Sequence, residues 1–167
     1  MVLFLGSSIG NFEPEAACGL LGGIRRQMTA GDALLLGTDM LKKASVMVPA
    51  YNDTRRVTAQ FNLNLLARIN RELGGHFDLH LFRHLALWNP EHHRIEMHLE
   101  STRNQTVAID ELGVEVAFKA GERIHTENSY KYRQAEISDI LGRAGFRPEH
   151  TWTDRRRWFG LHLARVQ

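Results

Sequence analysis

The sequence predicts an α/β protein in which a short piece of parallel sheet is interrupted by an inserted α+β lobe and then resumed. Three observations support this prediction. Two short apolar runs near the N-terminus flank a helical pattern, the middle of the chain alternates apolar and polar residues, and the chain closes on a helix and a hairpin.

The apolar runs, residues 2–5 and 33–37, have no polar alternation, which is typical of strands buried on both faces. Between them a helix is expected to open near Pro14 and to end at Gly31. Strand, helix and strand form a βαβ unit, which predicts parallel strands joined by a right-handed crossover. The glycines of residues 19–23 fall inside the helical pattern, so we do not interpret them as a phosphate loop.

A long helix is expected over residues 52–73, and Gly74 would end it. Its apolar residues are spaced by four, so we expect this helix to be well buried; they are Val57, Phe61, Leu65, Ile69 and Leu73. Period-two alternation over 95–99, 114–118 and 123–132 predicts antiparallel strands with one wet face. A helix over 134–143 and a hairpin around residues 154–157 would close the chain, and the first strand would leave an exposed sheet edge.

Composition narrows the functional classes. The 167 residues have a formal net charge of +2, which is too balanced to suggest a nucleic-acid-binding protein, and the arginines of 155–157 are interpreted as a solvated turn. No apolar run reaches the roughly 18 residues of a membrane span, and the N-terminus lacks the features of a signal peptide. The single cysteine, Cys18, allows no intramolecular disulfide and favours a reducing, cytoplasmic location.

Two segments are candidates for binding chemistry. Both predicted parallel strands end in Gly followed by Ser or Thr, and ligands of open α/β sheets sit beyond such strand ends. Residues 6–11 are therefore a candidate site, although small polar residues also make ordinary loops. His76, His80 and His84 are spaced by four, but the glycines before them argue against one helix, so we expect solvated histidines and no metal.

Glu127 and Ser129 lie two positions apart in a predicted strand, so their side chains face the same way with backbones about 7 Å apart. A carboxylate and a hydroxyl placed like this can bind both nitrogens of an imidazole, which offers one donor and one acceptor. The alternative is that both residues belong to an ordinary solvent-exposed strand face.

Several motifs occur in an order that resembles the histidine-specific S-adenosylmethionine-dependent methyltransferases, whose typical member makes N-α-trimethylhistidine (hercynine) in ergothioneine biosynthesis. The motifs are Gly6-Ser7-Ser8-Ile9-Gly10-Asn11, Leu35-Leu36-Gly37-Thr38-Asp39, Ala50-Tyr51-Asn52-Asp53, Ile95-Glu96-Met97 and Thr126-Glu127-Asn128-Ser129-Tyr130-Lys131-Tyr132. The resemblance covers essentially the whole chain. It implies that residues 1–41 and 132–167 form the second half of a Rossmann-like methyltransferase sheet and that 42–131 form most of a substrate-binding lobe.

The resemblance also implies roles for individual residues. Asn11 would hold the substrate's α-amino group, and the backbone of Gly6 and Ser8 would lie near the path of the methyl group. Tyr51 would bind the α-carboxylate, although it begins the predicted buried helix and could equally be a packing residue. The remaining assignments concern the imidazole: Glu127 and Ser129 would clamp it and Met97 would pack on it, although Ile95 and Leu99 make the face of Met97 resemble a core.

The same resemblance implies that the glycine-rich cofactor loop and the acidic ribose-binding residue of the family are not among these 167 residues. We therefore expect this chain to resemble the C-terminal half of a longer protein and to bind S-adenosylmethionine poorly when alone. We also expect self-association through the exposed sheet edge. The alternative function is a non-catalytic module that binds a small amino-acid-like ligand or a protein partner.

Overall fold

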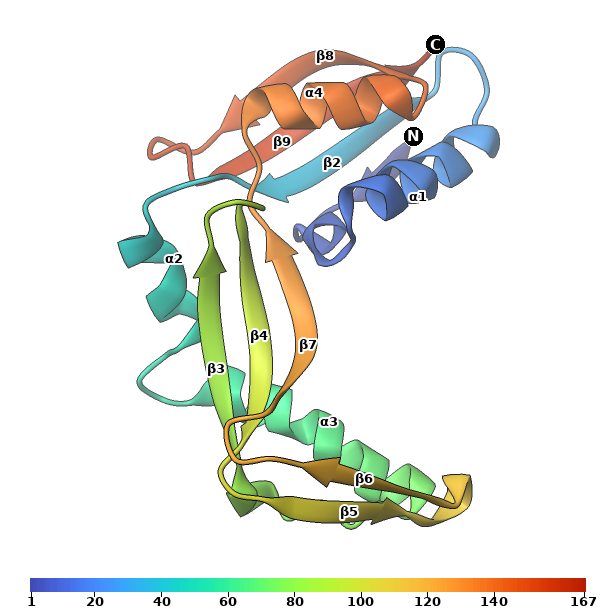
Figure 1. The fold of residues 1–167 in the computed structure, drawn as a ribbon. Coiled ribbons are helices and arrows are strands. Elements are labelled where there is room, and N and C mark those ends of the chain that lie inside the picture. Colours follow the sequence, from blue (N-terminus) through green and yellow to red (C-terminus); the bar gives the residue numbers. More distant parts are fainter. The chain divides into compact units, whose positions relative to one another are not determined.

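The computed structural model describes residues 1–167 as two compact units, and Figure 1 shows the elements of each. The first unit comprises Met1–Lys43, Asn89–Arg94 and Asn128–Gln167, and the second comprises Ala44–Trp88 and Ile95–Glu127. The division into a methyltransferase domain, 1–41 with 132–167, and a substrate-binding lobe, 42–131, stays a prediction.

The first unit is built on a four-stranded sheet in the order β1-β2-β9-β8. Its strands are β1 (Val2–Phe4), β2 (Ala33–Asp39), β8 (Phe146–Thr153) and β9 (Phe159–Val166). Strands β1 and β2 are parallel, whereas β9 runs antiparallel to both of its neighbours. The structure therefore confirms the predicted parallel pair and the closing hairpin.

The helices of the first unit are α1 (Pro14–Arg26) and α4 (Gln134–Arg143), and one turn of 3₁₀ helix, Ser8–Asn11, follows β1. Figure 1 shows α1 and α4 against the sheet. Their apolar faces share one core with β2, β8 and β9. Its fully buried members are Ala17, Leu21, Leu34, Leu36, Leu141, Phe146 and Ala164. The glycine-rich stretch 19–23 lies inside α1, as predicted.

Strand β1 stands at the edge of this sheet, as the sequence predicts. The side chains that alternate away from the core there are exposed: Leu3 is 57% accessible and Leu5 is 47% accessible. An unpaired edge with apolar side chains is a template for pairing with another strand. Self-association through this edge stays a prediction.

The second unit contains α2 (Ala44–Tyr51) and α3 (Val57–Leu73), the short 3₁₀ turns Leu79–Leu81 and Asp110–Leu112, and two sheets. One sheet has the order β3-β4-β7, with β3 (Phe82–Asn89), β4 (Arg94–Ser101) and β7 (Arg123–Tyr130). The other pairs β5 (Gln105–Ile109) with β6 (Val114–Phe118) in antiparallel register. Phe77, Phe82 and Phe118 pack ring against ring, with centroids 5.4–6.2 Å apart, and anchor the core of this unit.

The single helix predicted over 52–73 is wrong at its start. Tyr51 ends α2, and α3 begins only at Val57, because the Asp53 carboxylate accepts hydrogen bonds from the backbone N–H groups of Val57 and Thr58 at 2.9 Å each. A carboxylate that satisfies the first free N–H groups of a helix fixes where that helix begins. Strands β3 and β5 are further elements that the sequence analysis did not predict.

The predicted buried stripe of α3 is also partly wrong. Val57, Phe61 and Leu65 are 55%, 67% and 41% exposed, and the buried residues of the helix are Ala59, Asn62 and Leu66. The buried face contains a polar residue because the Asn62 side-chain amide donates to His84 Nδ1 at 2.9 Å and to the His98 carbonyl at 3.1 Å. A pattern of apolar residues alone could not identify this face. No helix of the protein combines the length and apolar character needed to cross a membrane.

Candidate functional site

The first loop of the first unit contains Gly6, Ser8 and Asn11. Gly6 and Ser7 both have positive φ, 80° and 60°, and the Ser7 hydroxyl accepts a hydrogen bond from the Asp39 N–H at 2.7 Å. This bond ties the loop after β1 to the end of β2, at the edge where ligands of parallel sheets bind. The Ser8 hydroxyl donates to the Leu5 carbonyl at 3.3 Å, and Asn11 ends the 3₁₀ turn with its side chain exposed.

The same loop needs glycine at position 10. A Cβ placed there would lie 3.0 Å from the Tyr130 carbonyl oxygen, so the loop passes close to the backbone of the T-E-x-S-x-K motif. The Tyr132 hydroxyl completes this contact by donating to the Ile9 carbonyl at 3.2 Å, and burial raises the pKa of Tyr132 far above its usual value. The loop of residues 6–11 is therefore held against Tyr130 and Tyr132, in the part of the second motif that belongs to the first unit.

Lys131 is the charged centre of this contact and is only 2% exposed. Its ammonium donates to Ser129 Oγ at 2.7 Å and pairs with Asp39 Oδ2 at 2.9 Å. Asp39 is also bonded by the ammonium of Lys42. A buried cation with two charge-assisted partners fixes the geometry of both, so Ser129 has a defined orientation within the first unit.

Tyr51, Met97 and Glu127 line one cavity of the second unit, with a volume of about 330 Å³. The other lining residues come from α2 and α3: Ala50, Val57, Thr58 and Phe61. Met97 is 4% exposed and lies between the fully buried Ile95 and Leu99, so it is a core residue that also borders the cavity. Three of the five predicted substrate residues are thus brought together, in a cavity of the size that holds small molecules.

His84 fixes the position of Tyr51. The Asn62 amide donates to His84 Nδ1, which leaves the proton on Nε2, and Nε2 donates to the Tyr51 carbonyl at 2.8 Å. The end of α2 is therefore bonded to β3 through a histidine of defined tautomer. The prediction that His84 is a solvated histidine is wrong, because both of its ring nitrogens are bonded to protein atoms.

The predicted residues thus fall into two groups. Asn11, Gly6, Ser8 and Ser129 belong to the first unit, and Tyr51, Met97 and Glu127 belong to the second. Glu127 and Ser129 both lie on β7, two positions apart, as predicted. The prediction that Tyr51 begins a buried helix is wrong, since Tyr51 is the last residue of α2.

The sequence pattern did not predict Lys131, Asp39 or His84 as site residues. Lys131 lies in one of the quoted motifs, and a lysine alternating with Ser129 on a strand is a signal that could have pointed to it. The burial of Lys131 is visible only in the tertiary structure, because its neighbours in the sequence do not distinguish it from a solvent-exposed lysine. His84 depends on Asn62, 22 positions away, and has no local signal.

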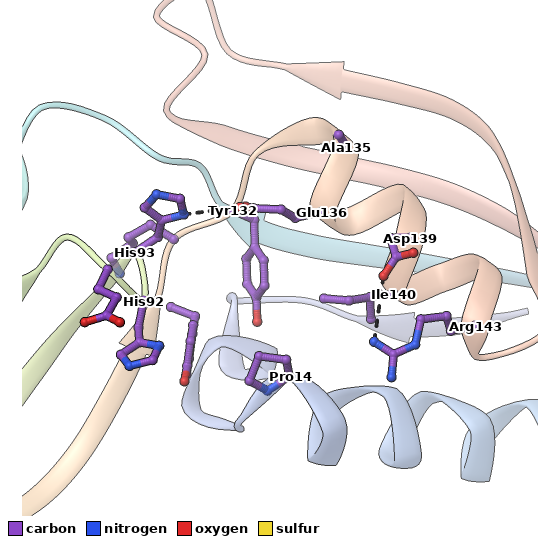
Figure 2. Close-up of a pocket in the computed structure, with 12 residues that line it drawn as sticks. Pro14, His92, His93, Tyr132, Ala135, Glu136, Asp139, Ile140 and Arg143 are labelled. Atoms are coloured by element: carbon purple, nitrogen blue, oxygen red, sulfur yellow. Dashed lines mark hydrogen bonds and ion pairs between the residues drawn. The ribbon is translucent and has the colours of Figure 1, made fainter.

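A larger cavity of about 560 Å³ lies within the first unit, between the start of α1, α4 and residues 91–93 (Figure 2). It contains none of the predicted site residues. Two pairs of lining side chains are drawn in Figure 2: His93 Nδ1 is 3.2 Å from Glu136, and Arg143 is 3.7 Å from Asp139. Arg143 is also bonded to Glu15, outside the lining, at 2.6 Å.

The chain matches the family model described as "Histidine-specific methyltransferase, SAM-dependent" over residues 1–166, which places it among the S-adenosylmethionine-dependent methyltransferases. Within that class, the chain belongs to the histidine-specific methyltransferase family. It is 46% identical to histidine N-alpha-methyltransferase of Mycolicibacterium smegmatis and 45% identical to that of Mycobacterium tuberculosis, each over 98% of this chain.

The chain spans about half the length of these curated relatives, 51% of each. Among solved structures, the PH0226 protein from Pyrococcus horikoshii is similar over 99% of this chain and 54% of its own, with a TM-score of 0.50 and 11% sequence identity. At that identity the likeness concerns the fold alone, and it agrees with the mixed α/β architecture described above.

Proposed function

We propose that this chain is the part of an S-adenosylmethionine-dependent N-methyltransferase that recognises histidine and presents its α-amino group, as in hercynine formation. The observation that supports the proposal best is the cavity of the second unit, because Tyr51, Met97 and Glu127 meet there. Membership of the histidine-specific family, together with these three residues in one cavity, favours an amino acid with an aromatic ring as the ligand.

In this proposal Glu127 accepts a hydrogen bond from one imidazole nitrogen and Ser129 donates one to the other. An ammonium can only donate, so Ser129 Oγ accepts from Lys131, and the hydroxyl proton of Ser129 points away from that lysine. Lys131 therefore orients Ser129 as a donor. A ligand without ring nitrogens would form neither the bond to Glu127 nor the bond to Ser129, and this difference accounts for selectivity.

The other ends of the ligand have separate partners. The Tyr51 hydroxyl binds the α-carboxylate, and Met97 packs on the ring. Asn11 orients the α-amino group through its side-chain amide, because an amide oxygen can hold a neutral amine without charging it. The amine must stay neutral, since transfer of a methyl group requires its lone pair.

The family uses S-adenosylmethionine, which supplies an electrophilic methyl group when bound. Gly6 and Ser8 are the residues here that would lie beside it. A Cβ added to Gly6 would meet no atom within 4 Å, so this backbone borders open space at the end of β1. The chain's own contribution to the reaction is to position the amine and to exclude water, which needs no covalent intermediate.

Calorimetric titration of the 167-residue chain with histidine tests the proposal. We expect saturable binding of histidine, at least ~tenfold weaker binding of phenylalanine because its ring has no nitrogens, and weaker binding of histamine because it has no carboxylate. Glu127→Gln should abolish the preference for histidine over phenylalanine. Glu115→Gln, which changes an exposed carboxylate of β6 in the same unit, is the matched control and should leave the preference intact.

Unchanged selectivity in Glu127→Gln would refute the clamp. The alternative is a non-catalytic module that binds a small amino-acid-like ligand or a protein partner. Because this chain is expected to bind S-adenosylmethionine poorly when alone, histidine binding without methyl transfer is expected in both cases. Preference for another amino-acid-like ligand over histidine would support the alternative. Binding together with transfer would support the enzyme.

A further inference from the structure

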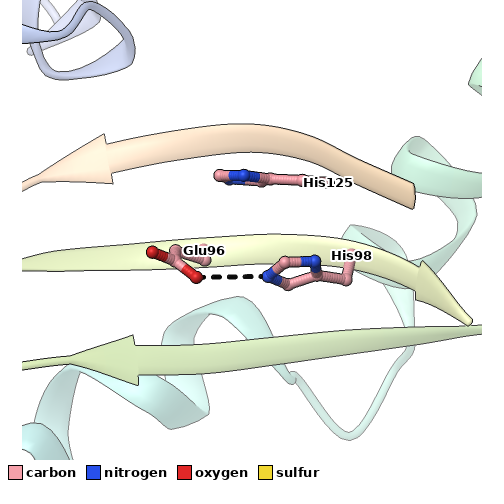
Figure 3. Close-up of side chains that lie close together, drawn as sticks. All are labelled: Glu96, His98 and His125. Carbon is pink, nitrogen blue, oxygen red and sulfur yellow. Dashed lines mark hydrogen bonds and ion pairs between the residues drawn. The ribbon is translucent and has the colours of Figure 1, made fainter. Parts of the chain in front are cut away.

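The histidines that converge in this protein are not the ones spaced by four. Glu96 and His98 alternate on β4, and His125 lies on β7, the neighbouring strand of the same sheet (Figure 3). One ligand atom from each of the three side chains lies within 4.8 Å of the others. All three residues belong to the second unit, and none of them lines the cavity of Tyr51 and Glu127. We propose that Glu96, His98 and His125 bind a divalent first-row transition metal ion, with zinc as the test ion.

The separations suit such an ion. Bonds of about 2.0–2.1 Å in tetrahedral geometry place ligand atoms about 3.4 Å apart. His98 Nε2 and Glu96 Oε2 are already 3.3 Å apart. His125 is exposed, so rotation about its side-chain bonds can bring its nitrogen to the remaining position without disturbing the core.

The donor set selects the class of ion. Two imidazoles and one carboxylate suit zinc, nickel or iron(II), whereas magnesium and calcium prefer oxygen ligands. Three protein ligands leave the fourth tetrahedral position to water or to a small ligand.

Two features of the surroundings bear on the site. His98 is largely buried, with 12% of its side chain exposed, and its Nδ1 has no hydrogen-bond partner among the protein atoms. A buried histidine with a purely structural role usually has both ring nitrogens hydrogen-bonded, and His98 does not. The positive charge of Arg123 opposes a bound cation, and its pairing with Glu100 at 2.8 Å offsets this only in part, because Glu100 is also paired with Arg83.

The rings of His98 and His125 are stacked, with centroids 4.7 Å apart and planes inclined by 25°. The stack keeps the two imidazoles adjacent. Because the nitrogen lone pairs lie in the ring planes, metal binding requires the exposed His125 to rotate out of the stack. The competing interpretation is that this stack and the bond to Glu96 are purely structural. Direct measurement of metal binding distinguishes the two.

The test is calorimetric titration of the chain, prepared without a histidine tag, with Zn²⁺, together with the visible absorption spectrum of the Co²⁺ form. We expect one zinc ion per chain, a cobalt spectrum of four-coordinate intensity, and no binding of Mg²⁺ under the same conditions. His125→Ala and Glu96→Gln should each weaken zinc binding at least ~tenfold. His125 is exposed, so its variant should fold even if a His98 variant does not.

His76→Ala is the matched control, because His76 also forms a histidine–carboxylate pair, with Asp110 at 2.9 Å, in the same unit. This variant should bind zinc as tightly as the unmodified chain. Zinc binding that His125→Ala leaves unchanged, or that His76→Ala removes, would overturn the proposal. Absence of saturable zinc binding by the unmodified chain would overturn it as well.

Discussion

In the first unit Lys131 is buried and bonded to both Ser129 and Asp39, whereas in the second unit Tyr51 and Glu127 border a cavity next to the exposed ring of Phe61. In the first unit a buried cation fixes the orientation of Ser129 and Asp39, whereas in the second unit Tyr51 and Glu127 form part of the wall of a cavity. The two groups of candidate residues therefore lie in different settings, one around a buried ion pair and the other around a cavity.

The largest effect expected from breaking this arrangement is in the first unit. Lys131→Met keeps the length of the side chain but removes the cation, so Ser129 and Asp39 lose a buried partner. We expect unfolding free energy to fall by about 3–5 kcal/mol, as for other broken buried ion pairs. Urea denaturation measures it, and Lys119→Met, at an exposed position, should change little. A Lys131 variant as stable as its control would show that the buried ion pair contributes nothing.

Neighbouring leucines of α3 sharpen the contrast within the second unit. Leu66 is 1% exposed and Leu65 is 41% exposed. Leu66→Ala should cost about 3 kcal/mol through lost burial and a cavity, and Leu65→Ala should cost within about 0.5 kcal/mol. Both are measured as shifts of the urea midpoint. Equal costs would mean that the exposed stripe of α3 is covered in solution.

A smaller effect comes from His162, which is buried in the first unit between Thr38 and Thr151, bonded at 2.8 and 3.0 Å. Burial lowers the pKa of His162 from 6.5 to about 4. The unfolded chain therefore binds a proton more readily, and stability falls as the pH decreases from about 6.5 to 4, by about 2–3 kcal/mol in total.

Urea titrations at several pH values measure this loss. His162→Gln should flatten the curve between pH 6.5 and 4, because the titrating group is gone. His80→Gln, at an exposed position, should leave the slope as it is. A slope that survives in His162→Gln would assign the acid sensitivity to other groups.

Much of the first unit follows from local pattern. Unbroken apolar runs predicted β1 and β2 as parallel neighbours, and apolar spacing with a proline at the start predicted α1. The closing hairpin followed from turn residues. Asp154 sits at that turn and its carboxylate accepts from the backbone N–H groups of Trp158 and Phe159, so local sequence does determine the geometry.

The second unit was harder to predict because its decisive contacts are distant in sequence and polar. The buried face of α3 includes Asn62, whose partners lie on β3 and β4, so a search for apolar stripes chose the wrong face. Helix α2 was not predicted, because it contains Pro49 and has no polar face to give an amphipathic pattern. For the site, the sequence identified the motif residues, but the role of Lys131 could be inferred only from its burial in the structure.

The smallest predicted effect concerns the junction of α2 and α3. Asp53 bonds the first N–H groups of α3, and these bonds lower the pKa of its carboxyl to about 2. A lowered carboxyl pKa contributes stability at pH values above the unfolded value of 3.8, and the contribution is lost as the pH falls through about 2. Asp53→Asn should therefore lower the urea midpoint slightly at pH 6 and not at pH 2.

Amide hydrogen exchange measures the effect of the same substitution on individual backbone N–H groups. Val57 and Thr58 donate to different oxygens of Asp53, and asparagine keeps only one acceptor oxygen, so at least one of these two amides should lose protection in Asp53→Asn. The amide of Leu66, in the third turn of α3, should keep its protection. Glu111→Gln, an exposed carboxylate that makes no such cap, should alter neither. Protection that persists at Val57 and Thr58 would mean that the helix starts there for reasons of packing, and the cavity wall that these two residues form would then not depend on the Asp53 charge.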